Sequence, residues 1–136
     1  MSTVSIGTDT GGSIRIPAAS CGCVGLKPAF GEIPLDGIVP LSRSLDHVGP
    51  IARTVNDAWI AYHALAGRPR TEPLHPDDRV APGRVRLGLL RRHFTDVIDD
   101  EVRLAFDAEL QRLQQAGVAL VDRHVPHAAE IASVYL

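Results

Sequence analysis

The sequence predicts an α/β fold, on the evidence of a strand, a helix and a second strand in its C-terminal half. Apolar and polar residues alternate over residues 84–89, as in a strand with one polar face. Another apolar stretch runs from Val118 to Val125, and a segment of helical periodicity lies between the two. Because short loops join the three elements, they form a βαβ unit, which requires parallel strands and a right-handed crossover.

The helix of this unit is expected to start at Asp99 or Asp100, either of which is a good capping residue, and to stop at Gly117. Apolar side chains recur along one of its faces at helical spacing: Val102, Ala105, Phe106, Leu110 and Leu113. A further helix is expected to begin near Ala128.

A separate helix is predicted to follow Thr54. Thr54 and Asp57 have the spacing of a capping box, with Asp in place of the usual Glu or Gln. Apolar residues then recur at helical spacing as far as Ala66, and Gly67 and Pro69 are stop signals.

We interpret the chain as part of one domain with three segments. Residues 1–67 form a core region that is rich in Gly, Pro, Ser and Thr up to about residue 52. Residues 68–83, with four prolines, form a surface loop, and residues 84–136 carry the βαβ-type continuation. A strand followed at once by a glycine loop at the start, and a helix without a stop signal at the end, lead us to expect truncation at both ends.

Composition excludes several classes of protein. With 45% hydrophobic residues and a net charge of -2, the chain is not a disordered segment. No apolar run reaches the roughly 18 residues of a membrane span, and the N-terminus lacks a signal-peptide pattern, so we expect a cytoplasmic protein. The nearest approach to a basic cluster is Arg84, Arg86, Arg91 and Arg92, which we interpret as a solvated rim rather than a nucleic-acid surface.

The two cysteines, Cys21 and Cys23, are separated by one residue, which is neither a redox nor a zinc spacing, and we expect them in the core. No cluster of His, Cys, Asp and Glu has the spacing of metal ligands, so we expect neither a metal nor a cofactor.

A glycine-rich loop at residues 7–15 is the most informative segment. Adjacent glycines allow several backbone N–H groups to point into one concavity, where they can bind an anion or a developing oxyanion. Ser13 at the end of such a loop is placed to attack a carbonyl carbon. On these residues alone an ordinary turn is the favoured reading, whereas a phosphate-binding P-loop is excluded because no Gly-Lys-Ser/Thr ending follows.

The longer string GTDTGGSIRIPAASCGCVG, with Leu26-Lys27-Pro28 after it and GIVPLSRSLDHVGPIARTV at residues 37–55, closely resembles the amidase signature family of hydrolases. The dense match covers about residues 7–67. The resemblance implies an α/β fold with a mixed central sheet flanked by helices. It also implies hydrolysis of an amide C–N bond through an acyl-enzyme, by a triad of Ser, a bridging Ser on a cis peptide, and Lys.

By this resemblance, Ser13 is the nucleophile. The backbone N–H groups of Thr10, Gly11, Gly12 and Ser13 form the oxyanion hole. Asp9 and Arg15 match polar positions that support the loop, although the sequence does not say which groups pair.

The other two members of the triad are not found in this sequence. In the family, the Lys base and the bridging Ser precede the nucleophile, and the single lysine here, Lys27, matches the Gly-Leu-Lys-Pro segment instead. His47 and His63 are interpreted as structural residues, although a Ser–His pair arising by convergence is an alternative. We therefore expect the isolated chain to be inactive.

Two hypotheses follow. In the first, the chain is part of an amidase that takes a small-molecule amide; residues 33–37 favour small amides over the tRNA-dependent branch of the family. In the second, it is a non-catalytic remnant or a binding module. Neither a nucleic acid nor a membrane is an expected partner. Association into homo-oligomers is expected through edges that truncation would expose.

Overall fold

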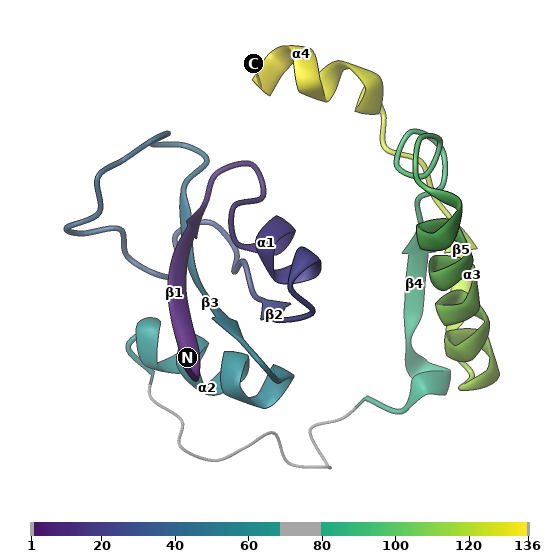
Figure 1. The fold of residues 1–136 in the computed structure, drawn as a ribbon, viewed down its shortest axis with the longest axis horizontal. Helices are drawn as coiled ribbons and strands as arrows, with labels where there is room; N and C mark the ends of the chain where they lie inside the picture. The colour runs from purple at the N-terminus through teal and green to yellow at the C-terminus, as the bar shows by residue number, and fades with distance from the viewer. Residues whose placement is uncertain (1, 69–79, 136) are drawn as a thin grey trace. The chain divides into compact units, whose positions relative to one another are not determined.

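The computed structural model describes residues 2–68 and 80–135, and it divides the chain into two compact units, Met1–Asp78 and Arg79–Leu136 (Figure 1). Most of the loop expected at residues 68–83 lies outside the described residues. No described helix is long and apolar enough to cross a membrane.

The first unit contains a three-stranded antiparallel sheet. Its strands are β1 (Val4–Asp9), β2 (Val24–Gly25) and β3 (His47–Ala52), in the order β1-β3-β2 (Figure 1). The register places Asp9 opposite His47 and Gly7 opposite Gly49. The central strand β3 therefore brings the segment around residue 46 next to the end of β1, where the glycine loop begins.

Helix α2 (Val55–Leu65) packs against β3 and confirms the predicted start and stop signals. Thr54 Oγ1 accepts a hydrogen bond from Asp57 N at 3.1 Å and donates one to Asp57 Oδ2 at 2.8 Å, which caps the first turn. Gly67 follows the helix with a φ of 68°, a conformation that favours glycine.

Ile14 anchors the short helix α1 (Arg15–Ser20) to the sheet. Its side chain is fully buried, and the three strands make room for it with one glycine each. A Cβ at Gly7 or Gly49 would lie 3.3 or 3.2 Å from the Ile14 side chain, and one at Gly25 would lie 2.8 Å from its carbonyl oxygen. The residue next to Ser13 is thus fixed in the core of the unit.

The second unit has the predicted strand–helix–strand order. After a short 3-10 helix (Pro82–Arg84) come β4 (Arg86–Leu89), α3 (Asp100–Gln115) and β5 (Ala119–Asp122). Strands β4 and β5 pair in parallel, and α3 lies along them (Figure 1). Another 3-10 helix (Ala128–Glu130) leads into α4 (Ile131–Tyr135). The α/β class and the parallel βαβ unit are confirmed.

Three details predicted from the sequence are wrong. Strand β5 is shorter than residues 118–125, because its partner β4 offers only four residues to pair with. On α3, Val102 and Ala105 are exposed although they share the predicted apolar face with the buried Leu110, so the face is buried only towards the end of the helix. Cys21 is exposed and Cys23 is half-buried, because they follow the end of α1 in a turn and not in the core.

Candidate active site

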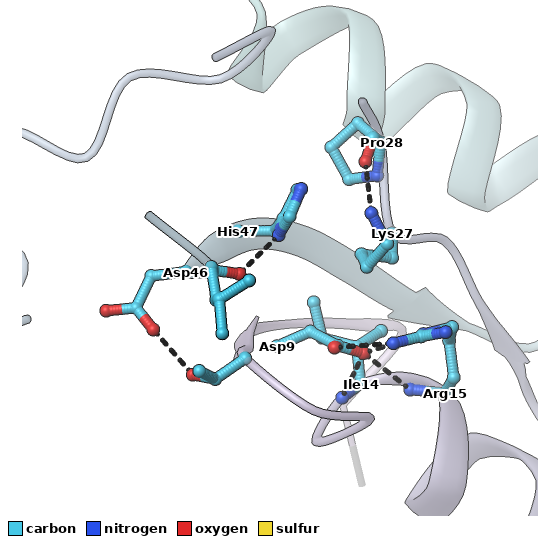
Figure 2. Close-up of polar contacts among 9 residues, drawn as sticks. Asp9, Ile14, Arg15, Lys27, Pro28, Asp46 and His47 are labelled. Carbon is cyan, nitrogen blue, oxygen red and sulfur yellow. Dashed lines mark hydrogen bonds and ion pairs between the residues drawn. The ribbon is translucent and has the colours of Figure 1, made fainter. Parts of the chain in front are cut away.

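Asp9 organises the glycine loop from the end of β1, where its side chain is completely buried. Its Oδ2 accepts hydrogen bonds from the backbone N–H groups of Ile14 at 3.1 Å and Arg15 at 3.3 Å. The Arg15 side chain then binds both carboxylate oxygens, Nε to Oδ2 and Nη2 to Oδ1, each at 3.0 Å (Figure 2). One carboxylate therefore closes the loop and holds the start of α1.

These contacts favour the charged form of Asp9. The hydrogen bond from the Arg15 side chain is the largest cause, with the two backbone N–H groups helping, and together they outweigh the cost of burial and lower the pKa of Asp9 to about 2. The same ion pair raises the pKa of Arg15. Asp9 thus carries a full negative charge at neutral pH, as a bidentate partner for a guanidinium should.

A second buried carboxylate, Asp46, fixes the other side of the loop. It accepts a 2.5 Å hydrogen bond from Thr10 Oγ1 (Figure 2) and bonds from the backbone N–H groups of Leu41 and Ser42 at 2.8 and 2.9 Å. The Thr10 hydroxyl, followed by the Ser42 N–H, lowers the pKa of Asp46. Residues 41–46 are therefore tied to Thr10 in the loop.

Asp46 is a residue of the candidate site that the sequence did not single out. The one signal available was its place immediately before the apolar strand β3, where an unpaired carboxylate is unfavourable and a buried one needs donors. Its partner Thr10 lies far away along the chain, so the contact depends on the pairing of β1 with β3.

Between these two carboxylates, four consecutive backbone N–H groups remain without an acceptor in the described part of the chain. They belong to Thr10, Gly11, Gly12 and Ser13, whereas the next two, Ile14 and Arg15, are taken by Asp9. Gly12 has a φ of 138°, and its carbonyl accepts a bond from Ile16 N at 2.7 Å. A run of free N–H groups in a loop of this kind can bind an oxyanion.

Ser13 itself is exposed, and within residues 2–68 and 80–135 its hydroxyl makes no hydrogen bond. It stands beside the free N–H groups and immediately before the buried Ile14. An alcohol in this position has the accessibility that a nucleophile requires, although a hydroxyl without a neighbouring base is a weak one.

The other residues considered as a base make contacts elsewhere. Lys27 Nζ donates to the Pro28 carbonyl at 2.8 Å, and His47 Nδ1 donates to the Leu45 carbonyl at 2.7 Å (Figure 2). His63 lies on α2 with its ring 4.1 Å from that of Trp59. In the described part of the chain, none of the three forms a hydrogen bond with Ser13.

Known proteins resemble this chain in sequence and in fold. The amidase family profile matches residues 1–136. The glutamyl-tRNA(Gln) amidotransferase (its A subunit) of Koribacter versatilis is 37% identical over 132 residues, which cover 90% of this chain and 28% of the relative. The 2-amino-5-chloromuconic acid deaminase of Comamonas testosteroni is 42% identical over 132 residues, covering 97% and 28%.

Solved structures of similar proteins have the same fold over nearly the whole of this chain. The glutamyl-tRNA(Gln) amidotransferase (again its A subunit) of Thermotoga maritima superposes with a TM-score of 0.84 at 28% identity, over 98% of this chain and 31% of that one. The peptide amidase of Stenotrophomonas maltophilia has a TM-score of 0.75 at 30% identity, over 98% and 30%.

The sequence and the fold thus place the chain among α/β proteins. The chain belongs to the amidase family. It spans less than a third of the length of the relatives just described.

Proposed function

We propose that residues 1–136 form the nucleophile-bearing part of an enzyme that hydrolyses the C–N bond of a carboxylic amide, with Ser13 as the nucleophile. The observation that carries the proposal is the run of four unengaged N–H groups from Thr10 to Ser13, held open by the contacts of Asp9 and Asp46. Membership of the amidase family supports the same chemistry.

In this proposal the Ser13 hydroxyl attacks the amide carbonyl carbon and gives up its proton to a base. The carbonyl oxygen becomes negatively charged and accepts hydrogen bonds from the free N–H groups. Losing one such donor typically costs about 3 kcal/mol of transition-state stabilisation. The C–N bond then breaks as the base returns the proton to the amine. Water releases the acid from the acyl-serine by the same steps.

The base lies outside this chain in the proposal. Lys27 is the only lysine in the sequence and its ammonium group is engaged by the Pro28 carbonyl. The family resemblance places the Lys base and the bridging Ser in a segment before the nucleophile. We therefore expect the 136-residue chain alone to show no steady amide turnover.

A small-molecule amide is the proposed substrate class. The preference rests on residues 33–37, which resemble those of small-amide hydrolases in the family more than those of its tRNA-dependent branch. Ile33 in this segment is buried, so that the segment is held against the rest of its unit.

The proposal is tested with a chimera. Residues 1–136 replace the matching segment of the Comamonas testosteroni deaminase, which supplies the rest of an amidase domain, and deaminase turnover is measured. We expect Ser13→Ala to lower kcat by at least about a thousandfold. Ser20→Ala is the matched control, because Ser20 is exposed at the end of α1 in the same unit.

Retention of activity by the Ser13→Ala chimera would exclude Ser13 as the nucleophile. A folded chimera without activity would favour the non-catalytic alternative. Steady turnover by the isolated chain, abolished by Ser13→Ala, would show that the base is not missing.

A further inference from the structure

A polar site unrelated to the glycine loop lies in the second unit, at the carboxyl ends of β4 and β5. Leu89 pairs with Asp122, and Arg123 N donates to the Leu89 carbonyl at 2.9 Å, so the two parallel strands end side by side. Residues that follow neighbouring parallel strands share one edge of the sheet, and this edge is where open α/β sheets bind ligands.

A cavity of about 300 Å³ occupies this edge. Arg92 and His93, which follow β4, line it together with His124 and Val125, which follow β5. The residues from His127 to Glu130 complete the lining. The volume is at the lower end of the range for small-molecule sites.

Three of the lining side chains have hydrogen-bond donors that are not engaged by other described residues. Within residues 80–135, the Arg92 guanidinium and the ring nitrogens of His93 and His124 make no hydrogen bond or ion pair. The adjacent Arg91 differs, because it binds Asp107 at 3.1 Å. An imidazole offers at least one N–H in either charge state, so these three side chains supply donors to the lining of one cavity.

The backbone holds two of the imidazoles in an unusual conformation. His93 has a φ of 73° and His127 a φ of 60°, in the left-handed region that non-glycine residues seldom occupy. Asp96 stabilises the first turn by accepting a 2.8 Å hydrogen bond from His93 N. Glu130 is the one carboxylate in the lining of the cavity. Its Oε1 lies 2.8 Å from His127 Nδ1, so it already has a partner.

We propose that this cavity binds the phosphate group of a small molecule. A phosphate presents several strong acceptor oxygens and a charge of nearly -2, which match one guanidinium and two imidazoles with free donors. Val125 and Ala128 supply an apolar wall for the organic part of the ligand. Among the described residues, no three His, Cys, Asp or Glu side chains are grouped to hold a metal ion, so the imidazoles act as donors here.

Equilibrium dialysis of the 136-residue chain against radiolabelled inorganic phosphate tests the proposal. We expect saturable binding with one site per chain, weakened about tenfold by Arg92→Gln, because a charge-assisted hydrogen bond is lost. Arg84→Gln is the matched control, since Arg84 precedes β4 at the opposite end of the same strand and does not line the cavity. Glu130→Gln is expected to tighten binding, because it removes the negative charge from the wall.

Competition by unlabelled ligands identifies the source of the phosphate. Phenyl phosphate that competes better than inorganic phosphate would assign the site to a phosphomonoester, and equal or weaker competition would assign it to free phosphate. Acetate that competes as well as either would overturn the proposal, as would the absence of saturable binding. A loss of affinity that is the same for Arg84→Gln and Arg92→Gln would also overturn it.

His93→Asn provides a second variant that preserves the turn. Asn tolerates a positive φ, so the backbone conformation is kept while the imidazole is removed. We expect weaker phosphate binding with an unchanged thermal transition, and unchanged binding would contradict the role of His93.

Discussion

Arg15 and Asp9 form a two-point ion pair across the glycine loop, with Nε–Oδ2 and Nη2–Oδ1 both at 3.0 Å. The carboxylate is fully buried, whereas the Arg15 side chain is about half exposed. Because the buried partner also binds the Ile14 N–H, the pair joins the end of β1 to the beginning of α1. The conformation of the residues between them therefore depends on this carboxylate as well as on Asp46, which binds Thr10.

Asp9→Asn is expected to destabilise the first unit by about 2–3 kcal/mol, since an amide cannot accept from all four donors at once and charge-assisted bonds are lost. Urea denaturation followed by circular dichroism measures the change. Asp36→Asn is the matched control, because Asp36 is exposed and we expect a change within about 0.5 kcal/mol. Equal stabilities of the Asp9→Asn variant and the unmodified protein would contradict the role given to the ion pair.

The ion pair also predicts how stability depends on pH. The pKa of Asp9 in the folded chain is about 2, below its ordinary value of 3.8, so folding favours the charged form. This contribution of about 2 kcal/mol is fully present above about pH 4 and is lost as the pH falls through about 2. The lowered pKa of Asp46 acts in the same direction.

Denaturation curves for the unmodified chain and for Asp9→Asn, recorded between pH 6 and pH 2, distinguish the contribution of Asp9 to stability from that of Asp46. The gap in unfolding free energy between the proteins is expected to narrow as the pH falls from about 4 to about 2. A gap that stays constant over this range would show that the charge of Asp9 does not stabilise the fold.

Elements with strong local signals could be predicted from the sequence. The helix after Thr54 is determined by its cap and its stop glycine, and the βαβ unit at residues 84–122 by alternation, periodicity and short loops. These signals act between near neighbours, so one sequence is enough to detect them.

Features that depend on contacts between distant segments were not predictable in the same way. The antiparallel pairing of β1 with β3 brings Thr10 to Asp46, and nothing near either residue indicates the contact. The sequence also did not show which group pairs with Asp9, because several donors compete for a carboxylate in a glycine loop. The exposure of Cys21 depends on where the turn after α1 lies.

The conformation of the loop makes a prediction about Gly12. Its φ of 138° is far from the left-handed helical value that other residues tolerate, so Gly12→Ala is expected to cost about 2–3 kcal/mol. A Cβ there would also lie 2.5 Å from Ile16 Cδ1, but that exposed side chain can rotate away. Gly22→Ala is the comparison, because its φ is 64° and no atom lies within 4 Å of the added Cβ, so about 1 kcal/mol is expected.

Thermal unfolding of both variants measures the difference. Equal losses of stability for Gly12→Ala and Gly22→Ala would show that the loop relaxes to an ordinary left-handed conformation when a side chain is added.

The last prediction concerns the apolar surface of the first unit. Strand β1 lies at the edge of its sheet, and Ile6 on it is 63% exposed, while Val39 and Leu41 on the loop before β3 are 90% and 81% exposed. Free strand edges and apolar side chains of this size favour association between chains. We expect the 136-residue chain to sediment as oligomers at micromolar concentration.

Replacing both Val39 and Leu41 by Ser is expected to shift the sedimentation profile towards monomer and to leave the thermal transition unchanged, because such exposed side chains contribute little to the core. Arg43→Ser, an exposed polar change in the same loop, is the control and should leave the oligomers intact. An unmodified chain that sediments as a single monomeric species would show that the exposed strand edge and apolar side chains do not cause association. If that monomer also unfolds cooperatively, each unit is stable without the remainder of an amidase domain.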